Sequence, residues 1–351
     1  MATSVVGRKR KAPTAATSDS SFARQLPAEK KQRAGVGIAT DRGGKASQED
    51  VYVIGGSRPD RLTLNGYSSP IAGTFGVFDG HGGDRASRYC AEHLFPKIAE
   101  EITTHNAAVD AAITNAVRAV DAEFCAIARR SSRPDLELQR AARFQSQLPG
   151  GRSMRSFAME DGSTCLVAVI RDGIVYVGNV GDSRAILATR GGKSVSLSND
   201  QKPGRKDERA RLEANGATVT GSPSFLYHVW PFNKLIDVPR VNGALAMSRS
   251  IGDLSLKPWI TCDPEITTHR LTANDQFLVM ATDGLWDVVS SKAAAKIAAG
   301  FDDAQQAADA LVKHALARKT YDNVTVVVVD VTSYTCSSAT TNSTSVQQIE
   351  S

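Results

Sequence analysis

Short apolar runs that stop at an acidic residue recur along this sequence, and they constrain its fold more than any other feature. One such run, 74–78, ends at Asp79 and is followed by Gly80, His81 and two more glycines. A short apolar run bounded by glycine predicts a buried strand leading into a loop whose backbone can approach a bound group closely. By itself, this stretch would equally well fit a turn that holds a hydrogen-bonded histidine. The rest of the chain must decide between these two interpretations.

The other apolar runs predict a largely antiparallel β fold with flanking helices. Asp172-Gly173 between two such runs is a typical hairpin turn, and glycine-rich turns between short successive runs favour antiparallel pairing. Within 108–130, apolar residues from Val109 to Ile127 recur every three or four positions, which predicts a helix with one buried face. Strands are expected at 36–39, 51–54, 73–78, 163–170, 174–178, 183–188, 276–281 and 324–329, and helices at 84–101 with an interruption at Pro96, 108–130, 208–215, 291–299 and 303–319.

Composition is that of a water-soluble globular protein. With 351 residues, 41% of them hydrophobic, the chain can form a sizeable core in one large domain or two small ones. No apolar run approaches the ~18 residues that a membrane helix needs, and the first residues lack the apolar segment of a secretory signal. The five cysteines are dispersed and form no C-x-x-C pair. They therefore predict a reducing compartment, with neither a disulfide framework nor a zinc site.

Positive charge is concentrated at the beginning of the chain. Residues 1–33 hold eight Lys or Arg and two acids, so their local net charge of +6 exceeds the net charge of +5 for the whole chain. This composition predicts a disordered basic tail over 1–34. Its two basic clusters, 7–11 and 29–33, resemble a bipartite nuclear-import signal, although a merely solvated tail would look the same, so we expect a nuclear or cytoplasmic location or both. The folded body is not basic, and we expect no direct contact with nucleic acid.

Three further segments differ in composition from the predicted strands and helices. Residues 129–157 hold seven arginines and several Pro and Gly, which indicates an inserted surface loop that either docks acidic partners or is a solvated linker. Residues 217–240 hold four aromatic side chains and little periodicity, and we expect a flap over the surface. The Ser/Thr-rich residues 334–351 are expected to be disordered. One folded domain then spans 35–333.

Acidic residues stand at the margins of several predicted strands. Each acid is most simply a turn former, because aspartate favours strand ends. Several carboxylates gathered at one end of a sheet would repel one another unless cations lay between them. An all-oxygen set favours Mg²⁺ or Mn²⁺ over zinc. The acids in question are Glu49, Asp50, Asp79, Asp182, Asp283, Asp287 and Asp322.

Six short motifs lie along the predicted folded body. They are FDGHGG at 78–83, DGST at 161–164, GDSRA at 181–185, VNGALAMSRSIGD at 241–253, ATDGLWDVV at 281–289 and DNVTVVVV at 322–329. In their order and approximate spacing, over about 35–331, they resemble the metal-dependent protein phosphatases of the 2C type, the PPM family. The resemblance implies an α+β fold, a four-layer α-β-β-α sandwich with two central, mainly antiparallel sheets. It also implies hydrolysis of phosphoserine and phosphothreonine in phosphorylated proteins by a hydroxide that bridges two Mn or Mg ions, without a covalent phosphoenzyme.

The resemblance also implies roles for single residues. Asp79 would bridge the two metals, and the carbonyl of Gly80 would bind one of them. Asp283 and Asp322, with Asp50, would hold the first metal, and Glu49 would act through the water shell of the second. Asp182 and Asp287 would form a looser third site. His81 is the best-placed general acid for the departing alkoxide, because an unperturbed histidine exchanges its proton near neutral pH.

This sequence departs from the family pattern at two positions. Lys45 stands where an arginine usually grips the substrate phosphate, and lysine lacks the bidentate fork, so Lys45 or the nearby Arg42 is expected to bind phosphate. In 199–203 a histidine that commonly precedes Lys-Pro is replaced by Gln201, a position to which we assign no catalytic role.

An active monomeric enzyme is the leading hypothesis. A pseudophosphatase that binds phosphoproteins with little turnover is the alternative, and every core ligand position that can be matched is filled. A different two-metal hydrolase, or a nucleic-acid-binding protein with a basic tail, is a further alternative, which the lack of interleaved basic and aromatic residues in the body disfavours.

Overall fold

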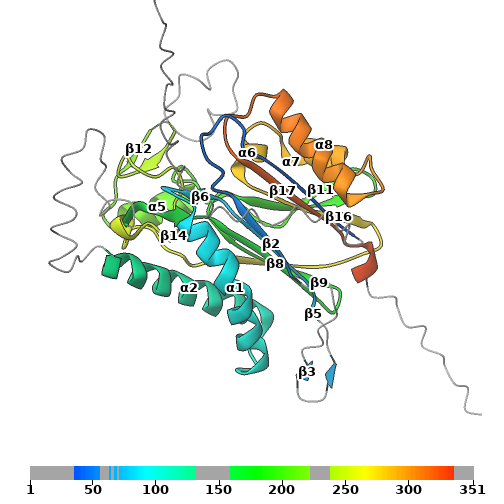
Figure 1. Cartoon of the computed structure of the whole chain (residues 1–351), viewed down its shortest axis with the longest axis horizontal. Helices are drawn as coiled ribbons and strands as arrows, with labels where there is room; N and C mark the ends of the chain where they lie inside the picture. Colours follow the sequence, from blue (N-terminus) through cyan, green and yellow to red (C-terminus); the bar gives the residue numbers. More distant parts are fainter. Residues whose placement is uncertain are drawn as a thin grey trace, which may run out of the picture. The chain divides into compact units, whose positions relative to one another are not determined.

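Two five-stranded sheets form the centre of the fold (Figure 1), and all the strand pairs within them are antiparallel. The first sheet has the order β1 (Val36–Asp41), β17 (Val324–Asp330), β16 (Asp275–Ala281), β10 (Arg184–Thr189), β11 (Ser194–Ser196). The second has the order β15 (Glu265–Arg270), β9 (Ile174–Val180), β8 (Cys165–Arg171), β5 (Ile71–Phe78), β2 (Val51–Gly55).

The computed structural model describes residues 35–55, 63–64, 67–68, 71–131, 159–221 and 238–335. The predictions about the basic tail 1–34, about most of the insertion 129–157, about 222–237 of the flap and about most of the tail 334–351 lie outside the described residues.

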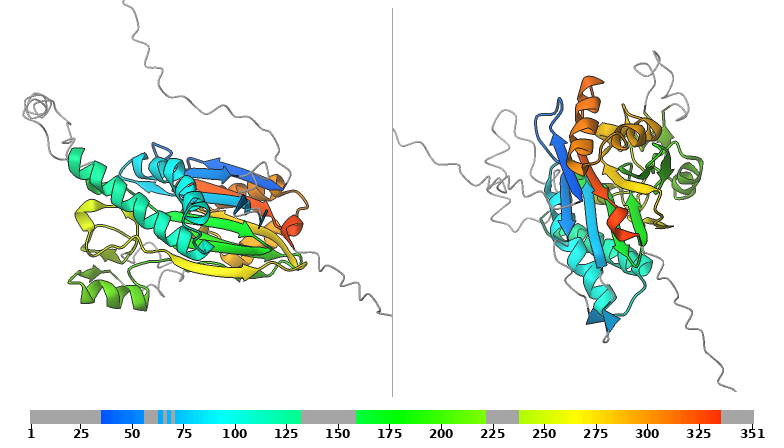
Figure 2. Two further views of the ribbon diagram at one scale, coloured as in Figure 1. Left: turned by 90° about the horizontal axis from the view of Figure 1, so that it is seen from below. Right: turned by 90° about the vertical axis from the view of Figure 1, so that its right-hand side faces the viewer.

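Each sheet is covered on its outer face by a pair of helices. Helices α1 (Arg85–Thr103) and α2 (Val109–Ser131) pack on the second sheet, with Leu94, Ile98 and Ile113 among the buried side chains. Helices α7 (Ser291–Ala298) and α8 (Ala304–Ala317) pack on the first sheet through small residues and Leu311. The right-hand view of Figure 2 shows the two helix pairs on opposite sides of the strands. The predicted four-layer α-β-β-α sandwich is thus confirmed.

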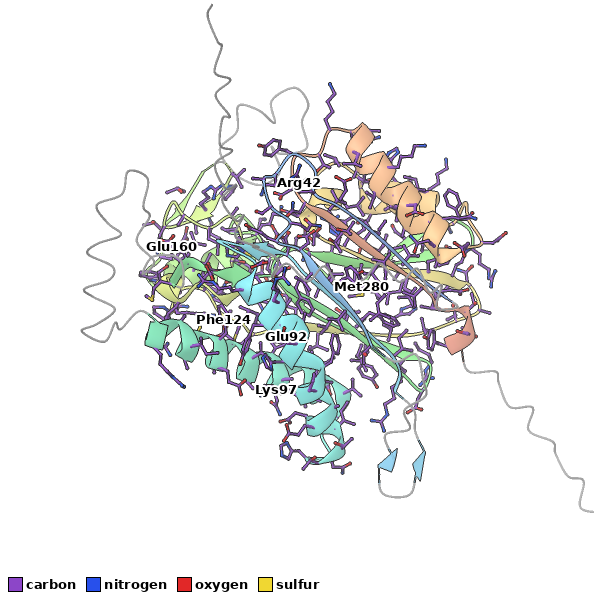
Figure 3. All side chains as sticks on the ribbon, viewed as in Figure 1. Arg42, Glu92, Lys97, Phe124, Glu160 and Met280 are labelled. Carbon is purple, nitrogen blue, oxygen red and sulfur yellow. The ribbon has the colours of Figure 1, made fainter. Side chains whose placement is uncertain are left out.

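The layer between the two sheets follows from the two-residue period of the strands. In β8, Leu166, Ala168 and Ile170 face the other sheet, and the residues between them face α1 and α2. In β16, Leu278 and Met280 face the second sheet, and Met280 is labelled among the strands in Figure 3. Each large apolar side chain buried in this way stabilises the fold by about 1.5–3 kcal/mol. Both faces of these central strands are therefore buried, which explains their continuous apolar runs.

Shorter elements complete the described chain. Of the predicted flap, the described edges form a strand pair, β12 (Val219–Thr220) with β13 (Arg240–Val241), rather than an irregular loop. The remaining elements are β3 (Thr63–Leu64), β4 (Tyr67–Ser68), β6 (Gly80–His81), β7 (Gly162–Ser163), β14 (Ile251–Gly252), α5 (Lys206–Ala214), α6 (Asp283–Trp286) and the 3₁₀ turns η3 (Leu254–Leu256) and η4 (Thr332–Tyr334).

Two predictions about the helices were wrong. Pro96 does not interrupt α1, because Leu94 and Ile98 on either side of it are buried against the second sheet and hold the helix in place although proline lacks an amide hydrogen. Ile127 is 44% exposed, because the buried face of α2 continues through Phe124, Cys125 and Ala128 and leaves Ile127 beside it. None of the helices in the described part of the chain is long and apolar enough to span a membrane.

Candidate active site

The sheet topology brings the strand-end acids to one end of the molecule. In an antiparallel pair, the end of one strand lies beside the beginning of the next. Val51 of β2 pairs with Phe78 of β5, so Asp50 lies beside Asp79. In the first sheet, Ala281 at the end of β16 pairs with Val326 of β17 and with Arg184 of β10. Asp182, Asp283 and Asp322 therefore occupy adjacent strand ends.

The loop 42–49 joins the two sheets at this same end. It leaves β1 after Asp41, which pairs with Val324, and it enters β2 at Val51. The Asn323 side chain holds the loop closed: its Oδ1 accepts a hydrogen bond from the Glu49 amide at 2.9 Å, and its Nδ2 donates to the carbonyls of Arg42 and Ser47. The loop thereby carries Lys45 and Glu49 to the acids.

Asp79 lies at the centre of the acidic group. Burial raises the pKa of Asp79 well above its usual range, and the charges of Asp50, Asp283, Asp182 and Asp322 raise it further. Burial likewise raises the pKa of Asp50 to about 6, although its carboxylate accepts a hydrogen bond from Thr282 Oγ1 at 3.0 Å. The charges of four other acids act on Asp79, so these carboxylates lie near one another.

Several oxygens of this group are buried without a hydrogen bond. Among the described residues, none donates a hydrogen bond to the Oδ1 atoms of Asp50, Asp182 or Asp283. Burial also raises the pKa of Asp283 well above its usual range, with the charges of Asp182 and Asp287 adding to the effect. A buried carboxylate oxygen without a partner is costly, and a hard divalent cation is the ligand that an all-oxygen set prefers. The residues present therefore fit a magnesium or manganese centre.

Two lysines supply part of the counter-charge. Lys45 Nζ lies 2.7 Å from Asp322 Oδ1, and Lys202 Nζ lies 3.4 Å from both Asp182 Oδ2 and Asp287 Oδ1. Burial alone would lower the pKa of Lys45, but the hydrogen bond and charge of Asp322 outweigh it and raise the pKa. Arg42 is labelled in Figure 3, and its side chain donates to the carbonyl of Ala46 at 3.4 Å. Of the two predicted phosphate ligands, Lys45 is the one that contacts an acid of the group.

His81 lies in the short strand β6, two residues beyond Asp79. Its Nε2 is 2.9 Å from Oδ1 and 2.8 Å from Oδ2 of Asp253. Burial alone would lower the pKa of His81, but the charge and hydrogen bond of Asp253 outweigh it, with smaller contributions from Asp182 and Glu49, and the pKa is raised. A raised pKa keeps more of the imidazole protonated near neutral pH, which suits a proton donor.

A second acidic group lies elsewhere in the fold. Oxygens of Asp207, Glu208 and Glu265 all lie within 4.8 Å of one another, closer than those of any other such trio in the described residues, including the acids around Asp79. However, Arg249 lies 2.6 Å from Glu208 and 3.2 Å from Glu265, and Arg205 is ion-paired with both Asp207 and Glu265. Arginines already neutralise these acids, so this group is a structural charge network.

Sequence reasoning missed several residues that support the site. Gln201 is fully buried, and its Oε1 accepts from the Gly181 amide at 2.7 Å while its Nε2 donates to the Asn179 carbonyl, so it holds the loop before Asp182. Five of the missed residues stand inside the recognised motifs, whereas Gln201 and Lys202 stand in the segment 199–203. For Thr282 and Asn323, a polar residue beside a candidate ligand was the available signal. The missed residues are Asp161, Thr164, Gln201, Lys202, Asp253, Thr282 and Asn323.

Comparisons with known proteins agree with this geometry. The family model described as protein phosphatase 2C matches residues 43–324. The chain is 34% identical over 296 residues to "Probable protein phosphatase 2C 69" of Arabidopsis thaliana, covering 84% of this chain and 69% of that protein. It is 39% identical over 262 residues to "Probable protein phosphatase 2C 68" of Oryza sativa subsp. japonica, covering 73% of this chain and 67% of that protein.

Solved structures give the same result. The crystal structure of serine-threonine phosphatase 2C from Toxoplasma gondii aligns with a TM-score of 0.61 at 25% identity, covering 84% of this chain and 94% of that one. Since the family model matches most of the chain, we conclude that this protein belongs to the protein phosphatase 2C family of metal-dependent serine/threonine phosphatases.

Proposed function

We propose that this chain removes phosphate from phosphoserine and phosphothreonine in proteins, with two Mg or Mn ions in the site and without a phosphorylated enzyme intermediate. The observation that carries the proposal is the convergence of Asp50, Asp182, Asp283 and Asp322 on Asp79, with buried oxygens that lack partners. When bound, two such ions supply Lewis acidity that activates a water molecule for in-line attack on phosphorus.

The ligands in this proposal are the strand-end acids. Asp79 and the carbonyl of Gly80 would contact the metals from the second sheet, and Asp283 and Asp322 would do so from the first. Asp50 and Glu49 would complete the pair of sites. Asp182 and Asp287 would hold a looser third ion, at the place where Lys202 supplies charge in this structure.

Two side chains act on the substrate in this proposal. Lys45 binds the phosphate as a point charge, since it is 45% exposed and stands beside Asp322. His81 gives its proton to the leaving serine or threonine oxygen, which would otherwise depart as an unstable alkoxide. Because the attacking oxygen comes from water, no side chain needs to form a bond to phosphorus.

Hydrolysis of a phosphothreonine peptide tests the proposal. We expect turnover with added Mn²⁺ and none after chelation, and we expect Asp283→Asn with Mn²⁺ to fall to the level of the chelated wild type. Asp309→Asn is the matched control, because Asp309 lies on α8 and accepts from Gln305. Turnover that survives both chelation and Asp283→Asn would contradict the two-ion mechanism, and peptide binding without turnover would contradict an active enzyme.

We further propose that the basic clusters in residues 7–33 direct the protein to the nucleus. The support is the charge pattern alone, in which two clusters flank a spacer. A fluorescent fusion lacking residues 1–33 is expected to lose the nuclear enrichment of the full chain. Unchanged nuclear enrichment of the shortened fusion would refute the import signal.

A further inference from the structure

The imidazole of His81 is held by a carboxylate that lies far away in the sequence. Asp253, 172 residues further along the chain, presents both of its oxygens to the single nitrogen Nε2, at 2.9 and 2.8 Å. Asp253 is only 3% exposed, so water competes little for this contact. A carboxylate only accepts hydrogen bonds, so Nε2 must carry the proton that lies between them.

Asp253 is itself fixed by its neighbours. Ser250 Oγ donates to Asp253 Oδ2 at 2.5 Å, and the Asp253 amide donates to the carbonyl of Asp161 at 2.8 Å. The backbone of Asp253 is left-handed, with φ 47° and ψ 47°, a conformation that costs a non-glycine residue about 1 kcal/mol or more. The surrounding contacts must hold the residue in this conformation, as is common where a side chain has to point in one direction.

Helix α2 anchors the same turn. Asp121 Oδ1 accepts a hydrogen bond from the Gly252 amide at 2.9 Å, and Lys257 Nζ lies 3.0 Å from this carboxylate. Asp121 is 9% exposed, so the ion pair is largely removed from water. The residue before Asp253 is therefore tied to α2, and the position of the Asp253 carboxylate does not depend on its own turn alone.

The backbone leaves room for the pair at one glycine. A Cβ atom on Gly162 would lie 2.2 Å from Asp253 Oδ2 and 2.3 Å from His81 Nε2. Such a contact is too short for any side chain, so a larger residue at 162 would push the imidazole and the carboxylate apart. Strand β7, which carries Gly162 and pairs with both β6 and β14, is thus shaped around this contact.

The hydrogen bonds of the His81 ring that involve described residues run to Asp253. Among the described residues, none forms a hydrogen bond with the other ring nitrogen, Nδ1, which is buried. We propose that Asp253 is a positioning residue for the proposed phosphatase reaction: it fixes the orientation of the His81 ring and keeps a proton on Nε2, and so holds the proposed general acid in one orientation and one tautomer. This inference rests on the proposed function.

The proposed step is balanced as follows. The attacking water forms the new bond to phosphorus, and its hydrogens leave with the inorganic phosphate. The bond from phosphorus to the serine or threonine oxygen breaks and leaves its electron pair on that oxygen. The protonated imidazole of His81 gives one proton to this oxygen, which becomes the free hydroxyl. His81 is left neutral and takes a new proton from water.

The leaving group of the substrate tests this role. p-Nitrophenolate departs without a proton, whereas the alkoxide of threonine needs one, so the ratio of kcat for a phosphothreonine peptide to kcat for p-nitrophenyl phosphate reports general-acid catalysis. We expect Asp253→Asn to lower this ratio about 100-fold, the usual size of a general-acid contribution, because an amide can present its NH₂ to Nε2 and reverse the tautomer. The KM for the peptide should change less than about threefold, since binding uses other residues.

Four further variants make the test specific. His81→Gln should lower the ratio as much as Asp253→Asn, and the double variant should lower it no further, because the two residues act as one unit. Asp263→Asn, an ion-paired aspartate ten residues away that contacts Arg118, should leave the ratio unchanged. If Asp253→Asn fails to fold, Ser250→Ala removes only one hydrogen bond to Asp253 and should lower the ratio about fivefold.

The outcomes separate this inference from the proposed function. An equal loss of both activities in Asp253→Asn, or no loss of either, would overturn the positioning role while the wild type remained a phosphatase. If Ser250→Ala is the variant measured, an unchanged ratio overturns the role in the same way. A wild type that hydrolyses neither substrate in Mn²⁺ would instead refute the proposed function.

Discussion

Negative charge without enough counter-charge is the main energetic problem of the site residues. A carboxylate removed from water costs several kcal/mol unless it is paired. Asp182 is buried here, and Asp79 and Asp283 are partly shielded from water. The contact of Lys45 with Asp322, and the contacts of Lys202 with Asp182 and Asp287, offset part of this cost. The pKa values of Asp79, Asp182 and Asp283 are raised all the same, so the lysines do not offset the cost fully. This is the physical reason to expect divalent cations.

Lys45 is one of the two residues at which this sequence departs from its family pattern, and the effect of this departure on phosphate binding can be measured. We expect Lys45→Ala to raise the KM for a phosphothreonine peptide about tenfold or more, because a hydrogen bond between charged groups contributes about 1.5–3 kcal/mol. Lys45→Arg should lower the KM below that of the wild type, since the guanidinium binds phosphate with two hydrogen bonds. Arg42→Ala serves as the comparison. If Lys45→Ala leaves KM and kcat unchanged, Lys45 does not bind phosphate.

At the level of elements, strand ends position most of the clustered acids, while the loop after β1 carries Lys45 and Glu49. β5, β16 and β17 are buried on both faces, so the residues just outside them are fixed by the packing of whole strands. The small helix α5 is attached differently, through ion pairs between its side chains and neighbouring arginines. The carboxylate of Glu208 on α5 accepts hydrogen bonds from Arg249 at 2.6 Å, from Arg211 at 2.9 Å and from Ser248 Oγ at 2.6 Å, and Glu208 is 1% exposed.

This attachment predicts a dependence of stability on pH. Burial alone would raise the pKa of Glu208, but Arg249, Arg211 and Ser248 outweigh it and lower the pKa from 4.5 to about 2. A lowered folded-state pKa contributes stability that is complete above pH 4.5 and disappears as the pH falls to about 2. Glu208→Gln should therefore cost roughly 3 kcal/mol at neutral pH, and the difference from the wild type should vanish toward pH 2.

Urea unfolding between pH 2 and pH 7 measures this difference. Glu213→Gln is the matched control, because Glu213 lies on the same helix but is exposed and pairs with Arg209 at 3.4 Å. We expect that control to differ from the wild type by less than about 0.5 kcal/mol at every pH. A loss in Glu208→Gln that stays constant across the whole range would show that the network does not depend on the Glu208 charge.

The layer between the sheets gives a second prediction for the elements. Leu278 of β16 is fully buried there, between strands that end at Asp79 and Asp283. Leu278→Ala should lower the free energy of unfolding by about 2–5 kcal/mol, because the close-packed sheets cannot collapse onto the cavity. Leu316→Ala on α8, where the side chain is 38% exposed, should cost less than about 1 kcal/mol. Similar losses for the two variants in urea unfolding would contradict the described core.

For the molecule as a whole, the sequence predicts the central strands well and the contacts between distant segments poorly. The runs 276–281 and 324–329 are long and apolar, so strands β16 and β17 could be predicted directly from the sequence. β15 was missed because residues such as Thr267 and His269 give no apolar alternation, and pairing with β9 is what holds it as a strand. The contact of His81 with Asp253 could not be predicted, since no local period encodes a distance of 172 residues.

The acids of the site were found by a different route. Asp50, Asp79 and Asp182 stand directly outside predicted strands, and Asp283 and Asp322 stand one residue further away. Antiparallel pairing places such positions together once the strand order is known. Their proposed metal ligation and the role of Lys45 came from the resemblance, and neither follows from the coordinates of the side chains alone. Asn323 and Gln201 were missed because they stabilise loops through hydrogen bonds with backbone groups, and these contacts can be seen only in the folded structure.

Calorimetric titration with Mn²⁺ is the most direct test of the central claim, that acids from both sheets gather two cations around Asp79. The wild-type full chain is expected to bind two ions, with a weaker third, and Asp79→Asn is expected to bind at most one. Asp110→Asn, on the exposed first turn of α2, should bind as the wild type does. Two ions bound by Asp79→Asn with unchanged affinity would contradict the account.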